Sequence, residues 1–288
     1  MSNKDLLDNI KKLRELTGVG FKDCKIALDE NNGSIEKSIE FLRKKGIAKA
    51  SKKMSRTASE GLALVKEKNG QMSIIEINSE TDFVAKNNDF INFCKELSEL
   101  NFNTKGDLQK LNETKMKNGL AVKDNLINFI SKIGEKITIR RANFLDNQKG
   151  VNFFYVHSAI EKNIGKIISL VKLDGIVKGK NDTIGSKVAM HIAASNPLAI
   201  DKDQIDKKIV DKEMEIIKAE ILNSGKPNEM VEKISKGKIS KFLNDNSLLN
   251  QLWIMDPKKK VFDILKENSI DKELKVLDFV KYKVGEGV

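Results

Sequence analysis

An Asn-Gly pair between two alternating segments limits the folds open to this chain. Leu62–Lys66 and Met72–Asn78 alternate between apolar and polar residues, and Glu67–Gly70 separates them. Asn-Gly favours the type I′ turn, whose twist matches that of two antiparallel strands. The sequence therefore predicts a β-hairpin at this point.

The order of hairpin, connector and helix occurs twice along the chain. A helix follows the first hairpin from about Asn88, and a second pair of strands at 151–160 and 164–173 precedes a helix near 184–195. Glu-Lys-Asn stands in both turns, and the two units otherwise share little sequence. The repeated order indicates a duplication of architecture.

The remaining predicted elements complete two related halves. They are a helix at 123–134, a strand at 136–144, a helix capped by Asp256-Pro257 that ends at Leu265, and a closing strand at Lys275–Val284. Antiparallel strands with helices beside them are typical of an α+β fold. We therefore predict a core with an N-terminal half at 61–146 and a C-terminal half at 147–288.

Residues 1–46 predict a small bundle of three helices. Apolar residues recur at helical spacing in three stretches, and Ser34 can cap the last of them, which we expect to end at Gly46. A bundle of this size has a small core, so we expect it to dock beside something larger. Residues 47–60 are basic and lack an apolar period, and we interpret them as a linker.

A helical-hairpin arm is predicted at about 200–247. Two mostly polar, helix-like stretches flank Ser224–Pro227, and proline suits the first turn of a helix. The apolar stripe of each stretch is narrow, as expected for an arm that has little core to bury.

Composition narrows the class of protein. The net charge of +11 and the pI near 9.3 are equally consistent with nucleic-acid and acidic protein partners. Cys24 and Cys94 are far apart in the sequence, which argues for a reducing compartment and against a disulfide framework or a zinc cluster. The N-terminus does not resemble a secretory signal, and no window approaches the roughly 18 apolar residues of a membrane span. We expect a soluble, cytoplasmic protein.

No motif in the sequence indicates an enzyme active site. Gly175–Asn181 has one spacer residue too few for a phosphate-binding loop, and Gly225-Lys226-Pro227 fails because proline has no amide to donate. His157 and His191 lack a second ligand at metal spacing, so a packed, hydrogen-bonded histidine is the simpler interpretation of each. His157 keeps the alternative of a polar contact at an interface. Cys24 fits a core position.

Phe83 lies in a polar connector between the first hairpin and the following helix. One interpretation is that the ring tucks under the hairpin as a staple, since most aromatic side chains are buried. Phe90 and Phe93 already supply that helix with an apolar face, however, and Asp82 and Lys86 flank the ring with charges that prefer water. The other interpretation is an interface anchor.

The residues around Phe83 carry a resemblance to a known family. Thr81–Asn87 reads Thr-Asp-Phe-Val-Ala-Lys-Asn, which is similar to the signature of elongation factor Ts, the guanine-nucleotide exchange factor of elongation factor Tu. Other stretches resemble the same family in order along the chain: Leu13–Gly20 with Asp23–Leu28, Ile39–Gly46, Met190–Pro197, Met255–Pro257 and Val284–Gly287.

The resemblance implies an architecture and a partner. It implies a ubiquitin-associated-like N-terminal domain of three helices, a core of two α+β halves, and an arm capable of self-association. The implied partner is elongation factor Tu, both GDP-bound and nucleotide-free. The implied role is nucleotide exchange on that partner, without covalent chemistry, cofactor or metal, and without a membrane or direct nucleic-acid contact.

The resemblance also implies site residues. Asp82 and Phe83 would invade the partner, and Thr81 and Val84 would complete the segment that displaces its magnesium ion. His157, at the position of the family's Tyr-x-His strand, would contact the partner. The N-terminal signature places six residues at or near the docking surface: Leu13, Arg14, Thr17, Gly18, Val19 and Lys25.

The chain departs from the family pattern at two places. Phe21-Lys22 stands where the family more often has Met. The sequence ends after Gly285–Val288, where some members continue into a helical tail.

A protein that binds RNA or the ribosome is the rival hypothesis from another class. It would use the basic linker at Lys49–Arg56 and the Lys-rich arm. Such a protein tends to carry aromatic stacking platforms between its basic residues, and this linker has none.

Overall fold

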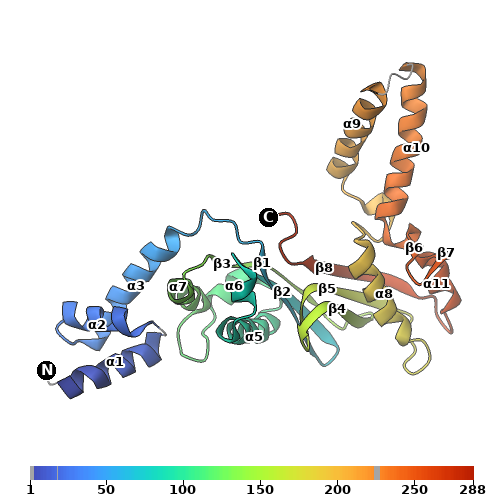
Figure 1. Cartoon of the computed structure of the whole chain (residues 1–288). Helices are drawn as coiled ribbons and strands as arrows, with labels where there is room; N and C mark the ends of the chain where they lie inside the picture. The colour runs from blue at the N-terminus through green and yellow to red at the C-terminus, as the bar shows by residue number, and fades with distance from the viewer. Residues whose placement is uncertain (1–2, 18, 224–227) are drawn as a thin grey trace.

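One antiparallel sheet runs through both halves of the core. The computed structural model describes residues 3–17, 19–223 and 228–288, and its main sheet has the order β3-β2-β1-β5-β4, with β8 also paired to β5 (Figure 1). These strands are β1 (Glu60–Lys68), β2 (Gln71–Ser79), β3 (Ile137–Leu145), β4 (Val151–Glu161), β5 (Ile164–Asp174) and β8 (Lys275–Lys283). The predicted α+β class is confirmed.

The hairpin predicted from Asn-Gly is present. Lys68 pairs with Gln71, which leaves a two-residue turn. Asn69 and Gly70 have φ angles of 54° and 75°, the left-handed values that a type I′ turn requires. In the second hairpin Glu161 pairs with Ile164, and Asn163 also has a positive φ, of 67°.

The two halves share hydrogen bonds across the sheet. Ala63 and Leu64 of β1 pair with Gly165 and Ile164 of β5, so the edge that β2 leaves free on β1 is partly covered. A Cβ atom at Gly165 would lie 2.6 Å from Val156 Cγ1, too close for any other residue without a shift. A glycine at this junction lets the strands approach.

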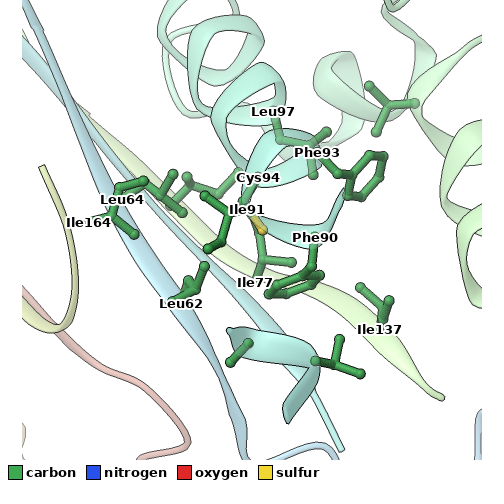
Figure 2. Close-up of a cluster of buried hydrophobic side chains, with 14 of the residues drawn as sticks. Leu62, Leu64, Ile77, Phe90, Ile91, Phe93, Cys94, Leu97, Ile137 and Ile164 are labelled. Atoms are coloured by element: carbon green, nitrogen blue, oxygen red, sulfur yellow. The ribbon is translucent and has the colours of Figure 1, made fainter. Parts of the chain in front are cut away.

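Helices cover one face of the N-terminal half. They are α5 (Asn88–Asn103), α6 (Leu108–Glu113) and α7 (Val122–Ile133). Phe90 and Cys94 of α5 lie close to Ile77 of the hairpin in a cluster that also includes Leu62 and Leu97, and all five are fully buried (Figure 2). Apolar residues at helical spacing on α5 thus meet the alternating apolar residues of β1 and β2.

Helix α8 (Thr183–Ser195) covers the corresponding strands of the C-terminal half. It packs so closely that a Cβ atom at Gly185 would lie 2.2 Å from the Phe153 ring. Beside it lie β6 (Leu252–Trp253), β7 (Asp256–Lys260) and α11 (Val261–Glu267). The prediction that Asp256-Pro257 caps a helix is wrong. Asp256 pairs with the buried Trp253 in a small hairpin, and the helix begins only at Val261.

The N-terminal bundle consists of α1 (Asn3–Thr17), α2 (Phe21–Glu30) and α3 (Ile35–Ser51). Ser34 caps α3 as predicted, accepting a hydrogen bond from Lys37 N at 3.4 Å. The predicted end at Gly46 is wrong. The helix passes Gly46 because that residue lies against α7, and four residues later it buries Ala50 in the core of the N-terminal half. The assignment of 1–46 as one domain and 47–60 as a linker stays a prediction.

The arm consists of α9 (Lys207–Asn223) and α10 (Asn228–Asn246), which lie side by side and project away from the sheet (Figure 1). Ile217, Ile221 and Ile239 form its small core. Short 3₁₀ turns at Lys202–Gln204 and Leu248–Asn250 flank it. The predicted bend at Ser224–Pro227 lies outside the described residues. Within the described ranges, no helix is long and apolar enough to cross a membrane.

Candidate partner-binding site

The Phe83 side chain points into solvent. It is 80% exposed, more than any other large apolar side chain that the structure describes. The interpretation of Phe83 as a buried staple is therefore wrong, and the exposed ring expected of an interface anchor is confirmed. Phe90 and Phe93 of α5 fill the core instead. Exposing a phenyl ring gives up the free energy of its burial, which indicates a contact with another molecule.

The connector around Phe83 (80–87, the first connector) is more ordered than a polar loop. Asp82–Ala85 form the one-turn helix α4. The Thr81 hydroxyl caps it by accepting from Val84 N at 3.4 Å, and Val84 and Ala85 are buried in the core of the N-terminal half. Asn87 caps α5 by accepting bonds from two backbone amides, and the helix begins at Asn88 as predicted. The helix thus has a buried side and a side that presents Phe83.

Asp82 lies at the start of α4 and pairs with Lys86 one turn later. The Lys86 ammonium donates to Asp82 Oδ2 at 2.6 Å, and this hydrogen bond lowers the pKa of the carboxyl below its usual value. Asp82 therefore carries a negative charge beside the exposed ring at neutral pH. Lys86 is exposed, so a partner could displace it and face the bare carboxylate.

His157 lies in the other half of the core, on the outer strand β4. Its side chain is exposed, and Nδ1 lies 3.4 Å from the hydroxyl of Tyr155, two residues earlier on the same face. The next residue, Ser158, has a positive φ of 52°, and the register of the pairing with β5 shifts a little further on, between Ala159 and Glu161. The exposed imidazole is available for a polar contact, which suits the interface alternative.

His191 is buried, whereas His157 is exposed. His191 is fully buried on α8 and stacks on Trp253, with ring centroids 5.2 Å apart. Its Nε2 atom lies 3.0 Å from Gln251 Oε1, within hydrogen-bond distance. The prediction of a packed, hydrogen-bonded histidine is confirmed here. Cys24 is buried as predicted. Within the described ranges, no three His, Cys, Asp or Glu residues gather closely enough to hold a metal ion.

The N-terminal residues predicted at the docking surface divide into two groups. Arg14 and Lys25 are exposed, whereas Leu13, Thr17 and Val19 are buried. The Thr17 hydroxyl donates to Leu13 O at 2.6 Å and accepts from Val19 N at 3.4 Å, which shapes the end of α1. The buried residues thus hold the turn that any docking surface here would use. Gly18 lies outside the described residues.

Sequence reasoning overlooked three residues that lie beside the predicted site residues. Leu16 and Phe21 flank the same turn with exposures of 42% and 47%, and Phe21 was noticed only as a departure from a pattern. Glu135 was missed altogether. It lies in the turn between α7 and β3 and accepts hydrogen bonds from both Thr81 N and the Thr81 hydroxyl. Fifty-four positions separate the two residues, so no periodic signal joins them.

Comparison with known proteins places the chain among one group of relatives. A profile of the family Elongation factor TS matches residues 80–286. The chain is 38% identical over 283 residues to Elongation factor Ts of Rickettsia felis, covering 97% of this chain and 91% of that protein. It is 40% identical over 284 residues to Elongation factor Ts of Methylorubrum extorquens strain PA1, covering 97% and 92% respectively.

Proposed function

Because the chain belongs to the elongation factor Ts family of translation factors, we propose that it binds elongation factor Tu and promotes the release of GDP. The observation that carries the proposal is the 80% exposed Phe83 ring on a helix whose other side is anchored in the core. The partner's GTPase site performs the chemistry, and this chain forms and breaks no covalent bond. It acts in the cytoplasm, where translation takes place.

Exchange requires that the factor bind the nucleotide-free partner more tightly than the GDP-bound one. The coupling is reciprocal: whatever affinity the factor removes from GDP, GDP removes from the factor. Each 1.4 kcal/mol of coupling changes affinity about tenfold. Burying one phenyl ring contributes on the order of 2 kcal/mol, so Phe83 alone accounts for more than one factor of ten.

Phe83 and the residues beside it have different roles in the proposed exchange. Phe83 enters a gap in the partner, and the Asp82 carboxylate competes with the oxygen ligands and water around its magnesium ion. Thr81 and Val84 hold the segment, the first as the cap of α4 and the second as its core anchor. Magnesium belongs to the partner's nucleotide site, and losing it weakens the hold on the GDP phosphates.

Two further surfaces extend the contact. Arg14 and Lys25 present positive charge on the N-terminal bundle to acidic groups of the partner, and the exposed Phe21 adds an apolar contact. His157 contacts the partner from the C-terminal half. Three separate contacts on one partner fix the orientation in which Phe83 enters.

The arm offers a surface for self-association. Ile209, Ile216, Leu222 and Met230 are between 41% and 53% exposed on its helices. Light scattering on the intact chain tests this: a species of twice the 32.3 kDa chain mass that Ile216→Asp converts to monomer supports it. A monomer at all concentrations contradicts it.

The release of a fluorescent GDP analogue from elongation factor Tu tests the exchange function. We expect release to accelerate with the concentration of this protein and to reach a plateau once the partner is saturated. Chelating magnesium should accelerate release without the factor and reduce the additional effect of the factor. An unchanged release rate at saturating factor would contradict the proposed function.

A further inference from the structure

We propose that Glu135 is a positioning residue for nucleotide exchange, because it fixes the one-turn helix that carries Phe83. The inference rests on the proposed function, in which the Phe83 ring enters the partner. Glu135 belongs to the turn between α7 and β3, a part of the chain that itself presents no exposed aromatic side chain. Its effect on exchange would therefore pass entirely through α4.

Both oxygens of the Glu135 carboxylate are used on one residue. Oε2 accepts from Thr81 N at 3.1 Å, and Oε1 accepts from the Thr81 hydroxyl at 2.7 Å. The hydroxyl oxygen of Thr81 accepts in turn from Val84 N at 3.4 Å. Glu135 is thus two hydrogen bonds away from the backbone of the residue that follows Phe83.

The neighbouring residues make the reverse contact. Lys136 N donates to Glu80 Oε1 at 2.5 Å, so residues 80–81 and residues 135–136 each supply a carboxylate to the other pair. Arg56 Nη1 lies 3.2 Å from Glu80 Oε2, and Lys136 Nζ donates to Arg56 O at 2.8 Å. Burial raises the pKa of Glu80, but the donors from Lys136 and Arg56 outweigh it and the pKa is lowered. Glu80 therefore stays ionised and the crossed contact persists.

A one-turn helix needs such support. Isolated turns of helix are unstable in water, because the first turn fixes several residues for very few hydrogen bonds. The apolar anchors Val84 and Ala85 resist removal of α4 from the core but do little to resist its rotation, since apolar contact is not directional. The two hydrogen bonds that Glu135 accepts from Thr81 are directional and charge-assisted. They set the angle at which Phe83 leaves the surface.

Pre-setting that angle matters for the proposed exchange. A mobile ring must be ordered when the partner binds, and that cost is subtracted from the free energy available to expel GDP. A ring on a fixed helix arrives in its binding orientation. Loss of Glu135 should therefore weaken exchange without removing any group that touches the partner.

Hydrogen exchange in the free protein tests the hold on α4. Peptides covering 80–87 should exchange about tenfold faster in Glu135→Ala than in the wild type, the effect of losing a hydrogen bond to a charged group. Thr81→Val should behave alike, and Thr81→Ser, which keeps the hydroxyl, should match the wild type. Should Glu135→Ala not fold, Glu135→Gln serves instead, because its NH2 group replaces one of the two accepting oxygens and cannot accept a bond from Thr81. If the amide hydrogens of residues 80–87 exchange at the wild-type rate in the folded variants, the inference is wrong.

A double-mutant cycle on GDP release from elongation factor Tu tests the path through the ring. We expect Glu135→Ala to lower the release rate at saturating factor about fivefold, and Phe83→Ala to lower it tenfold or more. The double variant should release GDP no more slowly than Phe83→Ala alone, because a positioning residue has nothing to position once the ring is gone. If the two effects multiply, Glu135 acts independently of Phe83 and the inference is wrong. If the wild type itself does not accelerate release, the proposed function fails, and hydrogen exchange still decides whether Glu135 holds α4.

Discussion

The two connectors of the core follow equivalent hairpins but present opposite surfaces. The first connector exposes the Phe83 ring on a helical turn, whereas the second connector (175–182) exposes Lys178, Gly179 and Lys180. The second connector is closed by Asn181, which is 4% exposed, accepts from Val177 N at 2.7 Å and donates to Asn268 O at 3.0 Å. Both connectors are tied to distant parts of the chain, and one of them carries an apolar group outward.

The comparison separates what the architecture requires from what it permits. A connector between a strand and a helix must satisfy its own backbone, and Asn181 and Thr81 do this by different means. Neither arrangement requires an aromatic residue in solvent. The Phe83 ring is therefore an addition to a fold that is complete without it, and substitutions in the two connectors should have opposite consequences.

The largest effect on stability is expected at Asn181. Asn181→Ala removes three hydrogen bonds from a buried side chain and should lower the free energy of unfolding by about 2 kcal/mol. The urea midpoint measures the loss, and GDP release by the folded variant should match the wild type. Asn181→Asp keeps the acceptor for Val177 N but sets a buried carboxylate oxygen against the carbonyl oxygens of Gly175 and Asn268, so it should lose at least as much. If Asn181→Ala slows GDP release without lowering stability, the second connector has a role in nucleotide exchange. The two connectors would then not differ in function as proposed.

Phe83 should show the reverse pattern. Phe83→Ala should slow GDP release about tenfold or more, the kinetic equivalent of about 1.4 kcal/mol, and leave the urea midpoint unchanged because the ring is 80% exposed. Lys178→Ala, at an exposed position of the second connector, is the matched control and should change neither quantity. A lower urea midpoint with normal exchange would make Phe83 a structural residue.

How far the sequence predicts this contrast depends on the range of the interactions. Asn69-Gly70 predicts its own turn and Ser34 its own helix start, because both signals act within a few residues. The sequence places Phe83 in a polar setting, but a staple and an anchor share this pattern, and only the exposure of the ring in the folded chain separates them.

The remaining errors arise where distant contacts override local signals. Gly46 reads as a helix end, but its contact with α7 carries the helix onward. Asp256-Pro257 reads as a cap, but pairing with Trp253 makes a strand. The sequence around Glu135 does not predict its hydrogen bonds with Thr81, because only the folded topology brings the two residues together. Leu13 belongs to the stretch that resembles the family signature and is fully buried, so any docking by this stretch would use its exposed neighbours.

A smaller effect is expected in the pH dependence of folding stability, to which helix α8 should contribute and helix α5 should not. Burial lowers the pKa of His191 on α8 below its usual 6.5, whereas Cys94 on α5 has a pKa raised by burial and stays neutral in the same range. As pH falls below 6.5 the unfolded chain takes up a proton that folded His191 does not, so stability is present above that pH and is lost below it. The slope cannot exceed one proton, about 1.4 kcal/mol per pH unit.

Urea unfolding between pH 8 and pH 5.5 measures this slope. His191→Gln should flatten the curve below pH 6.5, and Cys94→Ser should leave its shape unchanged even where it lowers stability. His157→Gln, at an exposed histidine, serves as the control for histidine number. If His191→Gln keeps the wild-type slope, the buried imidazole is not the source.

The smallest effect is expected beside the ring itself, at Asp82. Its carboxylate is paired with Lys86 at 2.6 Å on the exposed side of α4, so Asp82→Asn should leave the urea midpoint unchanged. If the carboxylate competes for the partner's magnesium shell, the same variant should slow GDP release about twofold to threefold, and less so at high salt, because exposed charges are screened. Lys86→Gln frees the carboxylate without removing it and should not slow release. If Asp82→Asn and Lys86→Gln slow GDP release equally, the ion pair orders α4 and the charge of Asp82 has no role of its own. Phe83 would then be the functional difference between the two connectors.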